Sequence, residues 1–197
     1  SNKNKVLTDF INTGVYDIER EFYMTNSPSM DILISSNLER LLYHLAGSDG
    51  GKVKELMEAL DSRKSYEIDD KIKAGMKDFY GGFCDVEETN AAIGKMFREN
   101  GYLMDTHTAV AYKVYEDYKR ETGDTKPALI ASTASAYKFA ESVCSAIGLP
   151  EQENGFAAVA ALEKKTGVRV PSGLKDLDKK EIRHKSVIDA ADMPQAV

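Results

Sequence analysis

PALIASTASAYKF, residues 127–139, is the stretch on which the fold prediction rests. The apolar run Ala128–Ala131 predicts a short strand, and the hydroxyl residues Ser132, Thr133 and Ser135 predict a polar turn before the apolar stripe of a helix. In open α/β sheets, ligands bind at the carboxyl ends of strands, where the following helix begins. Helix N-termini also attract polar or anionic groups through their unpaired N–H groups. Thr133 is therefore the first candidate ligand-binding residue.

Thr133 has a second interpretation as a helix cap. A Ser or Thr before a helix commonly accepts hydrogen bonds from the first turn, and every helix needs such groups at its start. The local pattern allows both roles.

Composition limits the class of protein. The chain has 197 residues, of which 42% are hydrophobic and 29% charged, as in soluble globular domains. The net charge of −6 argues against a surface for nucleic acid or anionic membranes. Cys84 and Cys144 stand far apart and fit free thiols in a reducing compartment. No leader or spanning apolar run is visible, so we expect a cytoplasmic protein.

Apolar stripes and capping residues predict eight helices. Two segments have the spacing of a capping box, Ser36 with Glu39 and Asp85 with Glu88, and Asp105 is a further cap. The predicted helices cover approximately residues 6–11, 38–45, 52–60, 69–79, 85–100, 106–122, 139–147 and 155–165.

Strand predictions are fewer and shorter. They fall at residues 21–25, 102–104, 128–131, 167–171 and 184–188. Strands separated by helices favour parallel pairing with right-handed crossovers. The predicted fold class is therefore α/β, a helix-rich partial three-layer domain with a short, mostly parallel sheet.

Three polar loops precede predicted helices. They are Asn26–Arg40, Asp105–Thr108 and Ser132–Ser135, and we expect them to converge at one end of the sheet. The alternative is three capped helices, with a structural role for His107 at a helix start. No phosphate-binding glycine motif and no His/Cys spacing of a metal site is present, so no metal is predicted.

Four blocks of sequence together resemble threonine synthase. They read NKVLTDFINTGVYD, FYMTNSPSMDILISSNLERLLYHL, GYLMDTHTAVAYKVYEDY and ALIASTASAYKF, and they occur in the order of that family's C-terminal half. The resemblance implies a pyridoxal 5′-phosphate enzyme with a fold like the tryptophan synthase β subunit. It also implies the reaction: a carbon–oxygen lyase that converts O-phospho-L-homoserine and water into L-threonine and phosphate.

The resemblance also implies roles for particular residues. Thr133 matches the position whose hydroxyl pairs with the pyridine nitrogen of the cofactor, and the adjacent Ser132 is the second expected cofactor-binding residue. Asn37 and Arg40 match a block that contributes to the phosphate site or the active-site wall. A segment that usually contains Asp-Pro-His-Thr has Thr106 in place of the proline, which favours structural roles for its neighbours.

The resemblance is partial, because the family's Schiff-base lysine and Gly-rich phosphate loop have no match here. We therefore expect residues 1–197 to be the C-terminal portion of the large cofactor-binding domain, with no catalytic residue of its own. We expect this portion to be inactive alone, to hold the cofactor poorly, and to self-associate through an exposed sheet edge. The alternative is a non-catalytic binding module that retains half of the fold.

Overall fold

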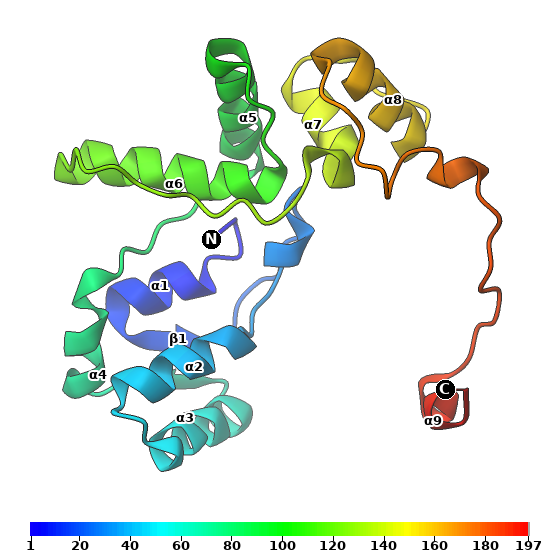
Figure 1. The fold of residues 1–197 in the computed structure, drawn as a ribbon. Helices are drawn as coiled ribbons and strands as arrows, with labels where there is room; N and C mark the ends of the chain where they lie inside the picture. Colours follow the sequence, from blue (N-terminus) through cyan, green and yellow to red (C-terminus); the bar gives the residue numbers. More distant parts are fainter. Residues whose placement is uncertain (197) are drawn as a thin grey trace.

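The computed structural model describes residues 1–196, and the predicted helix-rich fold is confirmed (Figure 1). The α-helices are α1 (Val6–Thr13), α2 (Ser36–Leu45), α3 (Gly50–Arg63), α4 (Asp70–Gly75), α5 (Val86–Asn100), α6 (Thr106–Thr122), α7 (Ala140–Ala146), α8 (Gly155–Thr166) and α9 (Met193–Ala196). The 3₁₀ helices are η1 (Pro28–Met30), η2 (Met76–Asp78), η3 (Ala136–Phe139), η4 (Leu177–Lys179) and η5 (Ala190–Asp192). Two strands, β1 (Val15–Asp17) and β2 (Ser65–Glu67), complete the ordered elements.

Capping side chains set most helix starts. The side chains that accept backbone N–H groups of a first turn are Asp49, Asp69, Asp85, Asp105 and Asn154. The capping box of Asp85 and Glu88 is confirmed, with both reciprocal bonds formed. The one predicted at Ser36 is wrong, because α2 already begins at that residue and its N-cap, Ser35, makes no side-chain cap bond.

The sheet differs from the prediction. β1 and β2 pair antiparallel, with Tyr16 opposite Tyr66, so the predicted parallel pairing is wrong for the described part of the chain. Each strand directly follows a helix that ends in the left-handed conformation, at Gly14 and Lys64. Neither strand was predicted from the sequence, because three residues are too few to show the alternation of a strand.

None of the five predicted strands forms a strand. Residues 21–25, 102–104, 128–131, 167–171 and 184–188 are extended or irregular instead. Their apolar and aromatic composition favours a strand, but a strand forms only beside a partner that takes its backbone hydrogen bonds. No such partner lies next to them among residues 1–196.

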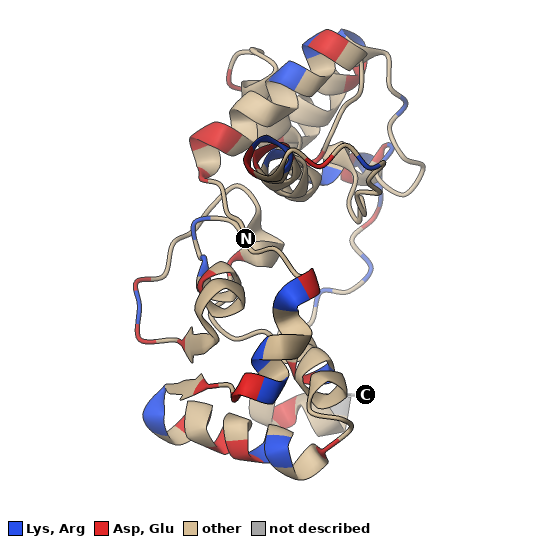
Figure 2. Cartoon of the chain, turned by 90° about the vertical axis from the view of Figure 1, so that its left-hand side faces the viewer, with Lys and Arg blue, Asp and Glu red and all other residues tan. Residues whose placement is uncertain are grey.

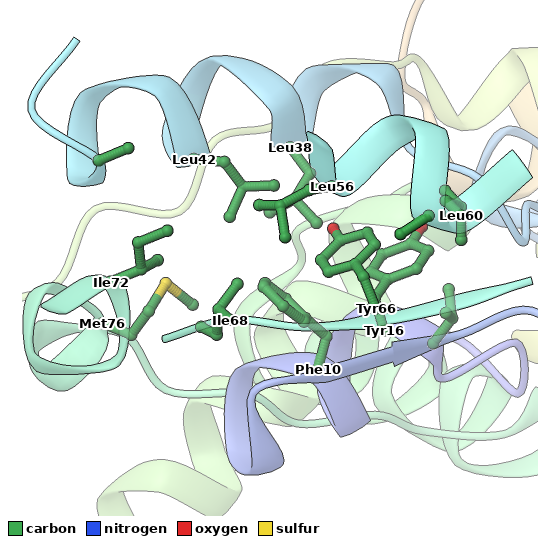
Figure 3. Close-up of a cluster of buried hydrophobic side chains, with 13 residues drawn as sticks. Phe10, Tyr16, Leu38, Leu42, Leu56, Leu60, Tyr66, Ile68, Ile72 and Met76 are labelled. Carbon is green, nitrogen blue, oxygen red and sulfur yellow. The ribbon is translucent and has the colours of Figure 1, made fainter. Parts of the chain in front are cut away.

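The first of two lobes contains α1–α4 and the sheet (Figure 1). Its core places the sheet between α1 on one side and α2 and α3 on the other (Figure 3). Tyr16 and Tyr66 stack with ring centroids 5.2 Å apart, and Phe10 meets both rings edge-on. Aromatic pairs of this geometry add to the stabilisation from burial alone.

The second lobe contains α5–α8 and has a separate core. Ile93, Val143 and Leu162 are fully buried there. α5 and α7 approach so closely at Gly94 that a Cβ at this position would lie 2.7 Å from the carbonyl oxygen of Ala146. Glycine at residue 94 therefore sets how closely these two helices pack.

Polar contacts join the two lobes. The amino group of Ser1 and the hydroxyl of Thr8 both donate to the carbonyl of Gly82, which lies just before α5. Asn26 in the first lobe donates to Asn90 on α5. Figure 2 shows charges of both signs interspersed along the helices, in keeping with the modest net charge of −6. The chain then leaves the second lobe after η4 as an extended segment that ends in α9 (Figure 1).

Candidate functional site

The three polar loops of the sequence converge where the lobes meet. The N–H of Ser29, at η1, donates to Nε2 of His107 at the start of α6, over 3.1 Å. At the next residue of α6, Oγ1 of Thr108 lies 2.9 Å from Oγ of Ser132. The segment that follows α6 runs back beside that helix before it reaches α7 (Figure 1). The start of α6 therefore binds both other loops.

Asp105 organises the start of α6. It is 1% exposed, and its Oδ1 accepts from the N–H groups of His107 (2.8 Å) and Thr108 (3.3 Å). Its Oδ2 accepts from the hydroxyl of Thr108. The predicted cap is confirmed, and a carboxylate buried this fully needs all of these bonds.

His107 is neutral in this arrangement. Because Nε2 accepts from the N–H of Ser29, the ring proton belongs on Nδ1, which faces Oδ1 of Asp105 at 3.3 Å and Oγ1 of Thr106 at 3.2 Å. Burial lowers the pKa of His107 below its ordinary value, and the neighbouring Asp105 only partly opposes that shift. The imidazole also packs against Phe139, with ring centroids 4.6 Å apart.

Loop 25–31 is held from its other side by a buried polar cluster. The carboxylate of Asp31 accepts from the side chains of Asn2 (2.7 Å), Asn4 (3.1 Å) and Thr25 (2.8 Å). Ser27 is fully buried and accepts from the Asn2 side chain at 3.0 Å. The loop is thus fixed to the N-terminal segment as well as to α6.

Thr133 lies on the surface, next to Ser132. Its hydroxyl makes no hydrogen bond to any described residue, and Ser135 is the residue that accepts from the following turn, at Tyr137 N–H. The interpretation of Thr133 as a cap is therefore wrong. An accessible hydroxyl without a protein partner fits a role toward a ligand, which stays a prediction.

Asn37 and Arg40 lie apart from this cluster in the hydrogen-bond network. Both are exposed on α2, and the guanidinium of Arg40 donates to Oδ1 of Asn37 over 2.6 Å. No hydrogen bond among residues 1–196 links either of them to α6 or to Ser132. Their predicted role at a phosphate stays a prediction.

A cavity of about 580 Å³ opens beside the converging loops. It is lined by Asn26 from the first lobe and by Lys138, Phe139, Asn154 and Phe156 from the second, among others. Its size is ordinary for a small-molecule site. Phe139 connects it to the cluster at the start of α6, since this ring also packs against His107.

Three structural findings bear on other classes of site. Cys84 and Cys144 are free, as the sequence predicted, and both are buried. Among the residues that the structure describes, no group of three or more His, Cys, Asp or Glu side chains could hold a metal ion. The described helices include none with both the length and the apolar composition that a membrane span requires.

The sequence did not single out the contacts that join the loops. The Ser29–His107 and Thr108–Ser132 bonds connect residues 78 and 24 positions apart, and no local pattern reports such pairs. One signal was present: polar residues preceded three helices, and their convergence was predicted on that basis. The structure brings the loops together at a helix start rather than at the end of a sheet.

Comparisons with known proteins point to one family. Residues 108–197 match the family described as threonine synthase, C-terminal. Threonine synthase-like 1 from Homo sapiens is 44% identical over 153 residues, which cover 77% of this chain and 20% of that protein. Threonine synthase from Methylobacillus glycogenes is 33% identical over 171 residues, covering 84% of this chain and 35% of that enzyme.

Solved structures agree with the sequence comparison. PLP-bound threonine synthase from Brucella melitensis superposes with a TM-score of 0.73 at 32% identity, over 92% of this chain and 35% of that one. Threonine synthase from yeast gives 0.76 at 31% identity, over 91% and 36%. The chain thus spans about a third of the threonine synthases and about a fifth of the threonine synthase-like 1 proteins.

Proposed function

We propose that this chain, a relative of the threonine synthases over most of its length, supplies the C-terminal part of a pyridoxal-phosphate-dependent threonine synthase. The main support for the proposal is the convergence of the segments that contain Ser29, His107 and Ser132. These contacts hold the residue next to Thr133 in place. The parent reaction in this proposal is the conversion of O-phospho-L-homoserine and water to L-threonine and phosphate, by a carbon–oxygen lyase in the cytoplasm. The free, buried thiols of Cys84 and Cys144 support that location.

Thr133 is the residue that we assign to the cofactor. Pyridoxal 5′-phosphate, when bound, acts as an electron sink for substrate carbons. A neutral hydroxyl at its ring nitrogen, rather than a carboxylate, would leave that nitrogen unprotonated. The cofactor would then withdraw electrons from the substrate less strongly. The accessible Thr133 hydroxyl fits this role, and its neighbour Ser132, our second candidate at the cofactor, contacts Thr108.

Asn37 and Arg40 are our candidates for the substrate phosphate. A guanidinium recognises phosphate through paired N–H groups. The Asn37 contact holds the exposed Arg40 side chain in one orientation on α2.

The test uses the full polypeptide encoded by the reading frame that contains these residues. Release of phosphate from O-phospho-L-homoserine is the assay. Thr133→Val is expected to lower kcat by at least about tenfold, because one hydrogen bond to the reacting system is lost. Thr133→Ser retains the hydroxyl and should retain most of the activity. Thr166→Val serves as the control, because this hydroxyl makes its bonds at the end of α8, donating to the carbonyl of Leu162 and accepting from the N–H of Val168. No phosphate release by the unmodified polypeptide would refute the proposal.

The 197-residue chain by itself is proposed to be inactive. It matches about a third of the PLP-bound enzyme, and none of its lysines lies in a motif that resembles the family's Schiff-base lysine. Adding pyridoxal phosphate should therefore produce no visible absorbance from a lysine-bound cofactor. Borohydride trapping of the cofactor on one unique lysine would contradict this.

A non-catalytic binding module is the second candidate. One observation favours it: relatives at 43–44% identity are named threonine synthase-like 1, whereas those named threonine synthase are 30–35% identical. The reading frame upstream of Ser1 separates the two. A lysine motif and a Gly-rich phosphate loop there support the enzyme, and an unrelated domain supports the module.

A further inference from the structure

Asp105 does more than cap α6. The caps of α3 and α4, Asp49 and Asp69, are exposed and each bonds one N–H group through its carboxylate in the cap. Asp105 is buried and uses both of its oxygens: Oδ1 for two N–H groups and Oδ2 for the hydroxyl of Thr108. The two N–H groups bound by Oδ1 are enough to cap the helix. The bond between Oδ2 and Thr108 therefore has an effect beyond capping.

That effect is on the position of the Thr108 hydroxyl. Its oxygen lies between Oδ2 of Asp105 and Oγ of Ser132, and the contact with Ser132 is 2.9 Å long. A carboxylate is a stronger acceptor than another hydroxyl, so the bond to Asp105 decides where the Thr108 hydroxyl lies. Asp105 thereby fixes the group that contacts Ser132.

The same carboxylate also orients His107. Oδ1 faces the Nδ1 proton at 3.3 Å, which leaves Nε2 as an acceptor for the N–H of Ser29. One buried carboxylate thus connects to the Ser132–Thr133 segment through Thr108 and to loop 27–31 through His107. Neither segment lies in a β-ladder, and on the side that faces α6 the contact of loop 27–31 is the bond of Ser29 to His107.

We propose that Asp105 is a positioning residue, which holds the Ser132–Thr133 segment and loop 27–31 in one fixed relation through Thr108 and His107. The proposal rests on the proposed function in one respect: Thr133 is the group whose position matters to a ligand. Asp105 itself touches no ligand in this proposal. Its contribution is to set the geometry of residues that do.

The test measures order in the chain itself, without cofactor. Backbone ¹⁵N relaxation reports the order parameters of Ser132 and Thr133, which we expect near 0.8, close to rigid backbone. In Thr108→Val the Ser132 contact is lost, and both values should fall below about 0.6. Thr108→Ser keeps the hydroxyl and should restore them. Thr166→Val, the matched control in α8, should leave them unchanged.

Ser132→Ala breaks the same contact from the exposed side. This variant keeps the α6 cap intact, so it remains informative if Thr108→Val does not fold. Thr133 should become mobile in it while the Ser29 amide stays ordered. Asp105→Asn keeps an oxygen for the cap but replaces the other acceptor with a donor, so both Thr133 and Ser29 should lose order.

The second readout is titration. Asp105 on α6, Asp31 on the facing loop, and Lys138 on η3 are the charged groups that act on His107, beside the ring of Phe139. Protonation of Nε2 removes the acceptor for Ser29. The amide chemical shifts of Ser29 and Ser132 should therefore change with pH around one common midpoint. Thr108→Val should remove the response at Ser132 and retain it at Ser29.

Two results would overturn the proposal. One is an unchanged order parameter at Ser132 and Thr133 in both Thr108→Val and Ser132→Ala. The other is a failure of Thr108→Ser to restore order in a folded protein. Because none of these measurements involves cofactor or substrate, their outcome is independent of whether the parent polypeptide makes threonine.

Discussion

At the residue scale, the contrast between Thr133 and Ser135 shows how a sequence pattern can be right in kind and wrong in position. Hydroxyl residues before an apolar stripe predicted a cap, and a cap is present, but Ser135 makes it. Thr133 lies two residues earlier, outside hydrogen-bond reach of the helical turn. Its accessible hydroxyl therefore has no structural use among the described residues and is available to a ligand.

His107 gives a prediction about stability and pH. Burial lowers its pKa in the folded chain, whereas the unfolded value is about 6.5. Below about pH 6.5 the unfolded chain binds the proton more readily, so the free energy of unfolding falls as the pH decreases toward the folded pKa. Above about pH 6.5 the contribution of His107 to stability is complete.

The measurement is urea unfolding at about pH 7.5 and about pH 5.5, on either side of the ordinary His pKa. His107→Gln keeps an acceptor for Ser29 and does not titrate. The difference in the free energy of unfolding between the two pH values should therefore become smaller. His184→Gln, on the exposed C-terminal segment, is the control and should leave the difference as it was. An equal pH dependence in His107→Gln and the unmodified chain would refute the prediction.

At the scale of elements, helices were predictable from sequence and strands were not. A helix satisfies its backbone within itself, so stripes and caps such as Asp85 and Asp105 contain most of what determines it. A strand depends on a neighbour that can be far away in sequence. Residues 128–131 have the composition of a strand and lack that neighbour within residues 1–196.

The packing of α5 against α7 gives a second prediction. Gly94→Ala should lower the free energy of unfolding by about 1–3 kcal/mol, the usual cost of overpacking a core. The added methyl group would lie 2.7 Å from the backbone oxygen of Ala146, and a backbone atom cannot move aside as a side chain can. Chemical denaturation followed by circular dichroism measures the change.

Gly155→Ala is the matched control for this prediction. Gly155 also lies in a helix, but nothing is within 4 Å of the position of its Cβ. Alanine has the higher helix propensity, so this change should be neutral or stabilising by up to about 1 kcal/mol. A neutral Gly94→Ala would show that α5 and α7 can separate at no cost.

At the scale of the whole molecule, the chain has two apolar cores and a polar boundary between them. The core of the first lobe and that of the second share no residue, and the contacts across the boundary described above are hydrogen bonds. The candidate site lies at this boundary, where loops from both lobes meet. Its geometry therefore depends on how the lobes are held together, which no local pattern in the sequence specifies.

The exposed apolar segment 127–134 yields the last prediction, that the chain self-associates. Leu129 is 96% exposed, and no backbone N–H of this segment bonds to a backbone carbonyl of the described residues. An extended apolar segment with unpaired backbone groups favours pairing with another copy. Sedimentation equilibrium should therefore show association that increases with concentration.

Leu129→Lys should weaken that association by at least about tenfold, since burying one Leu side chain contributes about 1.5–3 kcal/mol. A charge at this position also opposes its counterpart in the second copy if the two segments pair symmetrically. Val187→Lys is the matched control, because Val187 is 95% exposed and lies on the C-terminal segment between η4 and η5. If Val187→Lys weakens the association and Leu129→Lys does not, the C-terminal segment forms the contact and segment 127–134 does not. A monomer at every concentration would show that neither surface drives pairing.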